Sequence, residues 1–130
     1  MRVIQADKIR DTVRDLCVQA NLFLRNDCFA ALRIARTEET NKRAKDMLEA
    51  IIKNAEIAKR ERLAICQDTG FPCVFIEQGL GLKISGDLKS AINKGIVLGY
   101  ERGFLRDSVI KDPLLRGRPQ NQPAVIHTDI

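Results

Sequence analysis

Apolar residues recur at helical spacing in the first half of the chain. Over residues 4–24 they return every three to five positions, which is the stripe expected of an amphipathic helix. The polar stretch "RNDC" interrupts this stripe, and Asn26 or Asp27 is the expected N-cap of a short helix over residues 28–36. The pattern therefore predicts two consecutive helices in this part of the chain.

A third and longer helix is predicted over residues 38–62, with Thr37 as its N-cap. Its acidic residues come early and its Lys and Arg residues come late, as the helix dipole favours. The residues of its expected buried face are Ala44, Met47, Leu48, Ile51, Ile52, Ala55 and Ile57. Residues 1–62 are thus expected to form a layer of packed helices.

The pattern changes after Arg62 from helical to strand-like. Short runs rich in β-branched and aromatic residues, with glycines between them, predict strands over residues 73–79 and 80–85 joined by a tight connection. Residues 105–130 contain three of the four prolines, and they predict an irregular segment that ends in a strand over residues 124–130.

A helix is predicted between these strands, over residues 88–104, and Asp87 or Ser85 is expected to open it. It contains Gly95 and Gly99, which lower its helix propensity but allow another backbone to approach closely. The predicted fold class is α+β, with an N-terminal helical layer followed by a mixed β-sheet and a covering helix.

The chain stops on the strand-like run "VIHTDI", without a terminal helix or polar tail. We therefore expect residues 1–130 to be the N-terminal part of a larger domain, helical over 1–62 and α/β over 63–130.

Composition and charge narrow the expected partners. The net charge is +5, but the 22 Lys and Arg residues are spread along the chain, and one Tyr without Trp offers few surfaces for base stacking. Nucleic acid is therefore not an expected partner, whereas a small dicarboxylate or an acidic subunit is compatible with the charge. Neither a membrane span nor a signal peptide is visible, so we expect a cytoplasmic protein with reduced thiols and no membrane association.

The stretch "ICQDTGFPC" at residues 65–73 concentrates reactive side chains. The spacing between Cys66 and Cys73 does not match the close cysteine pairs of structural zinc sites, and the chain has a single histidine, His127. A catalytic pair of Cys66 and His127 has no supporting signature, and His127 is expected to be structural. Apolar neighbours predict that the other three cysteines are buried thiols: Cys17, Cys28 and Cys73.

Cys66 differs from the other cysteines because an amide, a carboxylate and a hydroxyl follow it in Gln67, Asp68 and Thr69. These groups can orient a polar ligand beside a thiolate, which is a soft metal ligand, and Asp68 could carry a proton there. The alternative is ordinary turn chemistry, in which Asp68 and Thr69 bond to nearby backbone groups. The residues by themselves leave both interpretations open.

Several stretches together resemble the class I, or iron–sulfur, fumarate hydratases and the related L-tartrate dehydratases. In chain order they are the third helix with "NAEIA", "CQDTGFPCVFIEQG", "GY…LRDSV…DPL" and "NQPAVIH". The resemblance covers nearly the whole chain and implies the N-terminal portion of an alpha subunit.

The resemblance implies roles for four residues. It implies a 4Fe–4S cluster held by three cysteine thiolates, one of them at Cys66, with an open iron that acts as a Lewis acid. Gln67 and Asp68 match positions that contact a dicarboxylate substrate, and Asp68 matches a catalytic proton-transfer residue. Arg106 in "LRDS" matches an arginine that binds a substrate carboxylate, for which a guanidinium is well suited. An arginine that only braces its loop is the alternative.

The same resemblance implies that the site is not complete within this chain. The two remaining cluster cysteines would lie beyond residue 130, and further substrate-binding groups would come from a beta subunit or C-terminal domain. The stretch "GRPQNQPAVIH" lacks an acid that much of the family carries, so no ligand contact is assigned to it.

The implied function is the alpha-subunit portion of an oligomeric hydro-lyase that interconverts fumarate and malate. Dehydration of L-tartrate or a related dicarboxylate by the same chemistry is one alternative. A non-catalytic remnant that only binds a partner is the other.

Overall fold

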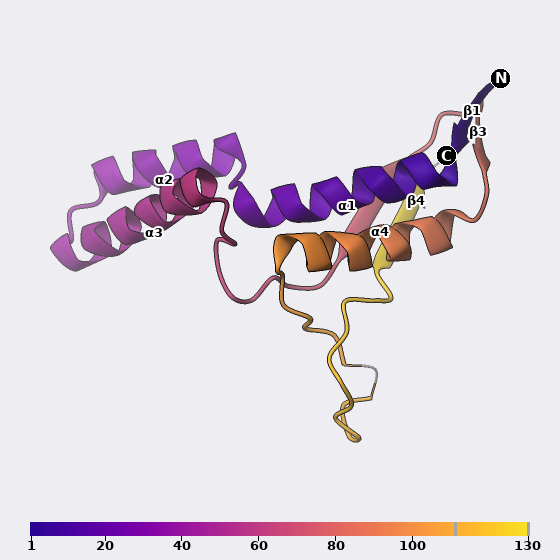
Figure 1. The fold of residues 1–130 in the computed structure, drawn as a ribbon. Coiled ribbons are helices and arrows are strands. Elements are labelled where there is room, and N and C mark those ends of the chain that lie inside the picture. The colour runs from indigo at the N-terminus through magenta and orange to yellow at the C-terminus, as the bar shows by residue number, and fades with distance from the viewer. Residues whose placement is uncertain (111, 130) are drawn as a thin grey trace. The chain divides into compact units, whose positions relative to one another are not determined.

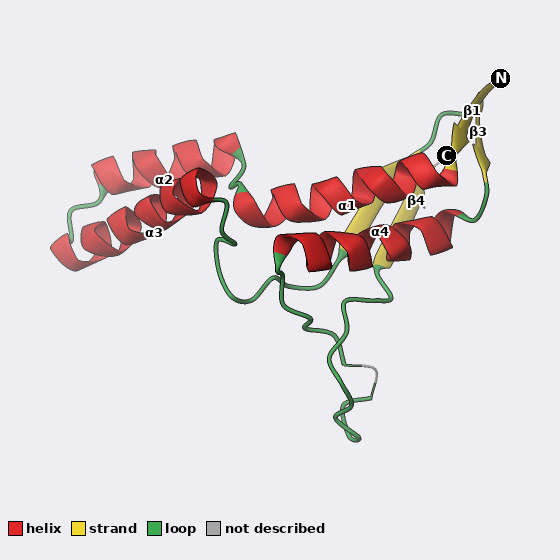
Figure 2. Cartoon of the chain, in the orientation of Figure 1, coloured by secondary structure: helices red, strands yellow, loops and turns green. Residues whose placement is uncertain are grey.

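The computed structural model describes residues 1–110 and 112–129 (Figure 1). The elements in chain order are β1 (Arg2–Gln5), α1 (Ala6–Leu22), α2 (Asn26–Glu38), α3 (Lys42–Glu61), β2 (Cys73–Glu77), β3 (Leu82–Ser85), α4 (Leu88–Gly103) and β4 (Val125–Asp129). Helices and short strands both occur, as Figure 2 shows, so the predicted α+β class is confirmed. None of the helices in the described ranges is both long enough and apolar enough to cross a membrane.

The chain forms two compact units. Gln19–Cys66 is the helical unit and contains α2 and α3. Met1–Val18 together with the chain from Gln67 onward is the larger unit, and it contains α4 and all four described strands.

The strands of the larger unit pair in a way that differs from the single mixed sheet expected from the sequence. Over the described residues they form two sheets of two parallel strands each, β1 with β3 and β2 with β4. In the second sheet Cys73 lies opposite Val125 and Glu77 lies opposite Asp129. The segment between β2 and β3 is short enough for an antiparallel hairpin, but each strand pairs instead with a strand distant in sequence. Local alternation of residues does not reveal such distant pairing.

The helices α1 and α4 approach each other closely in the larger unit, side by side in Figure 1. A Cβ atom on Gly95 would lie 2.5 Å from the carbonyl oxygen of Arg10, and one on Gly99 would lie 2.7 Å from the Cβ of Cys17. Both distances are too short for a real side chain. The close backbone approach predicted from the two glycines is therefore confirmed.

Burial on α4 centres on Ile92 and Ile96, whose side chains are fully buried. The other buried apolar residues of the larger unit are Val13, Ala91, Tyr100 and Leu105. In the helical unit the buried apolar residues are Leu22, Ile52, Ala55 and Ala58.

Three residues of the face predicted to be buried on α3 are exposed, namely Met47, Ile51 and Ile57. That prediction was wrong for them because α3 packs through a narrower stripe than its apolar pattern indicates.

Helix caps agree with the prediction at α4 and disagree at α3. The Asp87 side chain accepts a hydrogen bond from the Ser90 N–H at 2.9 Å, which confirms Asp87 as the N-cap. The predicted cap Thr37 is wrong, because Thr37 lies inside α2 and its hydroxyl donates to the Arg33 carbonyl. The N-cap of α3 is Asn41, which satisfies two N–H groups of the first turn.

At the start of α2 the predicted caps Asn26 and Asp27 are also wrong. Both lie within the first turn, and the N-cap position is held by Arg25, whose side chain makes no capping hydrogen bond. The Asp27 carboxylate instead accepts from the Cys28 N–H at 2.9 Å and pairs with Arg25.

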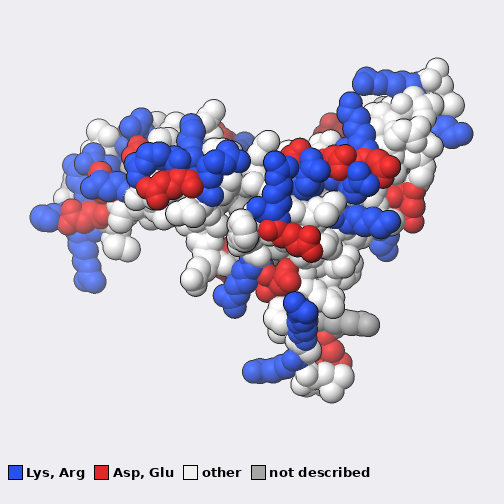
Figure 3. Space-filling view, viewed as in Figure 1, with Lys and Arg blue, Asp and Glu red and all other residues white. Residues whose placement is uncertain are grey.

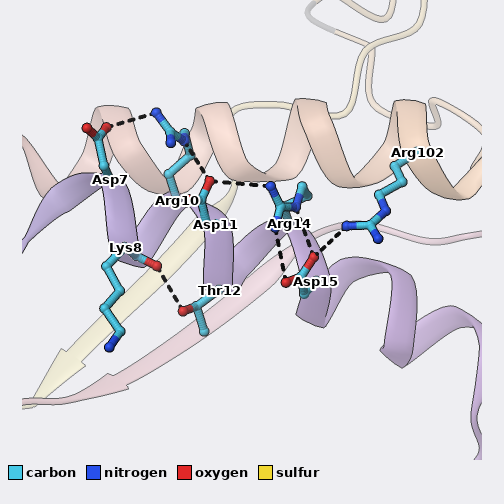
Figure 4. A network of polar contacts seen from close by, with 8 residues as sticks. All are labelled: Asp7, Lys8, Arg10, Asp11, Thr12, Arg14, Asp15 and Arg102. Carbon is cyan, nitrogen blue, oxygen red and sulfur yellow. Dashed lines mark hydrogen bonds and ion pairs between the residues drawn. The ribbon is translucent and has the colours of Figure 1, made fainter.

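An alternating row of charges runs along α1 and reaches α4 through Arg102 (Figure 4). The ion pairs of this row join Asp7 to Arg10, Arg10 to Asp11, Asp11 to Arg14, Arg14 to Asp15, and Asp15 to Arg102. The hydrogen bond from Arg10 lowers the pKa of Asp11, and the bond from Arg14 lowers that of Asp15. These pairs are exposed to solvent, so each contributes little to stability. On the face drawn in Figure 3, basic and acidic side chains are interleaved rather than gathered by sign.

Candidate functional site

The segment that carries the predicted site residues lies between α3 and β2 and has no regular secondary structure. Cys66, Gln67 and Asp68 are all exposed. The Asp68 carboxylate accepts a hydrogen bond from the Gly70 N–H at 3.2 Å, and Gly70 has a φ of +74°. Only glycine adopts this backbone conformation readily, so Gly70 permits the turn that presents Asp68.

The structure joins this turn to the segment that follows α4. The hydroxyl of Thr69 donates to the carbonyl oxygen of Arg106 at 2.7 Å, across 37 residues of sequence. Asp68 precedes the donor and Arg106 supplies the acceptor, so the predicted acid and the predicted carboxylate-binding arginine are brought together through one hydrogen bond. Turn chemistry and a functional role are therefore compatible at this turn.

Tyr100 lies beneath the turn. It is 4% exposed, and its hydroxyl lies 3.3 Å from the Thr69 carbonyl oxygen and 3.5 Å from that of Gly70, both long contacts for an O–H donor. Burial raises the pKa of the Tyr100 phenol, negative charge on neighbouring groups that include Asp68 raises it further, and the hydrogen bond to Thr69 lowers it.

The segment that carries Arg106 is fixed by contacts of its own. Val109 and Gln120 exchange two backbone hydrogen bonds, at 2.7 and 2.6 Å. The Asn121 side chain is buried and donates to the Asp107 carboxylate at 2.8 Å. These contacts close the segment between residues 107 and 121 into a loop and hold its first residues in place.

A cavity of about 640 Å³ opens beside this loop. Its polar lining residues are Tyr100, Glu101, Asp107, Arg118, Gln120, Asn121 and Gln122. The predicted residues Gln67, Asp68 and Arg106 do not line it. The sequence did not indicate this cavity, because Asp107 and Asn121 lie in two separate stretches of the chain and meet only in the fold.

The segment leading to Cys66 is fixed by two hydrogen bonds within the helical unit. The Ile65 N–H donates to the Asn21 carbonyl at 2.9 Å, and the Asn54 side chain donates to the Ile65 carbonyl at 2.7 Å. Cys66 is the last residue of the helical unit, whereas Gln67, Asp68 and Arg106 belong to the larger unit.

The other cysteines differ from the buried thiols expected from the sequence. Cys28 and Cys73 are exposed, so the prediction was wrong for both. Cys28 lies in the first turn of α2, and Cys73 begins β2 with its side chain on the exposed face. Cys17 is partly buried, and burial raises the pKa of its thiol from 9.0 to about 11. A thiol so difficult to ionise is a poor thiolate ligand at neutral pH.

The described residues do not provide a complete iron–sulfur site. Over residues 1–110 and 112–129, no three His, Cys, Asp or Glu side chains are grouped so that they could hold a metal ion. A cluster held by three thiolates therefore does not fit these residues alone, although the exposed thiol of Cys66 is accessible enough to serve as one ligand.

Comparison with known proteins extends the resemblance seen in the sequence. A family model described as "Fumarate hydratase (Fumerase)" matches residues 10–130. A protein of Methanocaldococcus jannaschii, provisionally named L(+)-tartrate dehydratase subunit alpha, is 36% identical over 111 residues. The alignment covers 84% of this chain but only 39% of that relative, so the chain spans about two fifths of the relative's length.

Proposed function

The chain belongs to the fumarate hydratase family, and from this premise we propose that it forms part of the alpha subunit of a hydro-lyase that reversibly hydrates fumarate to malate. The observation that carries the proposal is the hydrogen bond from the Thr69 hydroxyl to the Arg106 backbone carbonyl, which joins the exposed turn containing Asp68 to the segment containing the exposed Arg106 within one unit. A dicarboxylate substrate requires a cationic group for binding, and hydration requires a group that moves a proton.

Each site residue has a distinct proposed task. Arg106 binds one substrate carboxylate through its guanidinium, and the Gln67 amide donates a hydrogen bond to the substrate. Asp68 transfers the proton that is gained or lost at carbon when water adds or leaves. The Asp68–Gly70 turn orients the carboxylate before substrate arrives, which lowers the entropic cost of reaching the reactive geometry.

The proposed cofactor is a 4Fe–4S cluster with Cys66 as one thiolate ligand. The accessibility of the Cys66 thiol supports this role. Because the described residues lack a complete ligand set, the other thiolates would come from polypeptide outside them. A cytoplasmic location, expected from the sequence, stays a prediction.

The proposed partner is a beta subunit or C-terminal domain, in an oligomeric enzyme. The M. jannaschii relative is named as a subunit alpha, which supports an enzyme of more than one part. The β2–β4 sheet gives further support, because Phe75 is 75% exposed there and stacks on His127 with a ring-centroid distance of 4.9 Å. Two-stranded parallel sheets are rarely stable with an uncovered apolar face, so further polypeptide is expected to cover this one.

Dehydration of L-tartrate is the second candidate reaction, and the name of the M. jannaschii relative is the observation that favours it. Both reactions would use the Arg106 guanidinium to bind the substrate and the Asp68 carboxylate to transfer the proton.

An assay of the complete enzyme, purified without oxygen together with its partner, tests the proposed function. We expect fumarate hydration to exceed tartrate dehydration, and we expect activity to fall after exposure to air, because an open iron site is oxidised. If tartrate were turned over faster than fumarate, dehydration of L-tartrate would become the proposed reaction. If preparations that contain iron and partner showed no activity toward either fumarate or tartrate, that result would contradict the proposed function.

A further inference from the structure

We propose that Thr69 is a positioning residue of this site: its hydroxyl holds the Arg106 backbone and thereby sets the separation between the Asp68 carboxylate and the Arg106 guanidinium. This inference rests on the proposed function of the same site. It adds a residue that touches neither the reacting atoms nor the substrate.

The hydrogen bond of Thr69 joins the turn to the segment that carries Arg106. Its length of 2.7 Å is at the optimum for an O–H donor. Three neighbouring contacts are longer: Tyr100 reaches the Thr69 and Gly70 carbonyls at 3.3 and 3.5 Å, and the Ser108 hydroxyl reaches the Arg106 carbonyl at 3.4 Å. The Thr69 hydrogen bond is therefore better formed than these neighbouring contacts.

Each segment is braced independently of that bond. On the turn side, Asp68 and Gly70 form a closed turn over the buried ring of Tyr100. On the arginine side, Leu105 is buried and its N–H donates to the Tyr100 carbonyl at 2.9 Å. The loop that follows is closed by Val109 with Gln120. Two braced segments joined by one short bond keep a fixed separation while the bond is present.

That separation matters for the proposed reaction because one substrate molecule must contact both side chains at once. A misplacement of about 1 Å between a binding group and a reacting group can reduce turnover on the order of 100-fold. Losing the Thr69 bond would lower kcat more than it raises KM, because Arg106 could still bind a carboxylate from a displaced position.

The variants Thr69→Val and Thr69→Ser separate the hydroxyl from the shape of the side chain. Valine has nearly the shape of threonine but cannot donate, whereas serine keeps the donor and loses a methyl group. In the complete enzyme with fumarate, we expect Thr69→Val to lower kcat about 10- to 100-fold with a change in KM below about threefold. We expect Thr69→Ser to retain kcat within about threefold of the unmodified enzyme.

Thr37→Val is the matched control. The Thr37 hydroxyl also donates to a backbone carbonyl, that of Arg33 at 3.0 Å, but it belongs to α2 of the helical unit, whereas Thr69 belongs to the larger unit. We expect this variant to retain the kcat of the unmodified enzyme.

The outcomes distinguish failure of this inference from failure of the proposed function. If the unmodified enzyme hydrates fumarate and Asp68→Asn removes that activity, the function stands. Unchanged kcat in Thr69→Val would then overturn the positioning role alone. A Thr69→Val enzyme that fails to assemble, or a Thr69→Ser enzyme as slow as Thr69→Val, would also overturn it, because either result assigns Thr69 to folding or packing. Inactivity of the unmodified enzyme toward both dicarboxylates would instead overturn the function.

Discussion

At the residue scale, the turn at Asp68 and the thiol at Cys17 show how the fold changes the chemistry of single side chains. Gly70 adopts a left-handed conformation that lets its N–H reach the Asp68 carboxylate. Burial of Cys17 against α4 disfavours the charged thiolate and keeps the thiol protonated.

Burial of Cys17 predicts a specific loss of stability at alkaline pH. The pKa of its thiol is 9.0 before burial and about 11 in the folded chain, so stability is fully present below pH 9. As pH rises from about 9 to about 11, the unfolded chain loses this proton first, and the free energy of unfolding falls by about 2 kcal/mol.

Denaturant unfolding of the chain at several pH values measures this loss. Cys17→Ser should flatten the decrease between pH 9 and 11, leaving a smaller decrease from Tyr100, whose pKa is also raised by burial. The exposed Cys28→Ser should keep the full decrease. An equal decrease in the Cys17→Ser chain would contradict the assignment.

At the element scale, the pairing of α1 with α4 depends on the absence of side chains at two positions of α4. The Cβ of an alanine at Gly95 would lie 2.5 Å from the Arg10 carbonyl oxygen, a backbone atom that cannot rotate away. One helix must then shift, although alanine itself favours the helix more than glycine does.

Gly95→Ala is therefore expected to destabilise the chain by about 1–3 kcal/mol. Gly117→Ala is the control, because nothing lies within 4 Å of the position its Cβ would take. Thermal unfolding of both variants gives the comparison. If Gly95→Ala were as stable as the unmodified chain, α1 and α4 would not pack as closely as described.

The helices also show which structural features can be predicted from local sequence patterns. The helix α4, its Asp87 cap and the need for glycine at Gly95 were all predictable, because each depends on residues within a few positions or on one missing side chain. The Thr37 cap was wrong because two polar residues, Thr37 and Asn41, could each begin a helix, and only packing of the turn between α2 and α3 decides which one does.

The candidate site also contains residues that the sequence predicts and residues that it does not. Asp68 and Arg106 are predicted site residues because of their motifs, and the structure joins their segments through the Thr69 hydrogen bond. The contribution of Tyr100 and the Asp107–Asn121 pair was not predictable, because these residues contact partners 14 to 31 positions away, and the stretches that contain them do not show which residues they contact. Long-range contacts of this kind appear only in the folded chain.

At the scale of the whole molecule, the described residues carry part of the proposed site, and the proposed partner would supply the rest. The larger unit carries Asp68 and Arg106, whose segments are joined by the Thr69 hydrogen bond, and the helical unit ends in the exposed thiol of Cys66. The alignment reaches 39% of the M. jannaschii relative, and the β2–β4 sheet exposes Phe75. Missing metal ligands and an uncovered sheet are both expected where further polypeptide packs.

A charge placed on this exposed sheet should weaken association with the partner. Phe75→Glu would bury a carboxylate in any apolar contact made there, which is costly without a cationic neighbour. We expect at least about a tenfold loss of partner affinity, measured by co-purification or by titration of the partner. Met47→Glu, at an exposed apolar position on α3, is the control and should keep the affinity. Equal affinity of the Phe75 variant would place the partner elsewhere.

The most direct test of the central claim is the kcat for fumarate hydration by the complete enzyme carrying Asp68→Asn. The substitution keeps the size and polarity of the side chain but removes the carboxylate that is proposed to transfer the proton. We expect kcat to fall by at least about 100-fold with the enzyme still assembled. The control Asp46→Asn, at an exposed aspartate on α3, should keep full activity. Turnover by the Asp68→Asn enzyme equal to that of the unmodified enzyme would contradict the account.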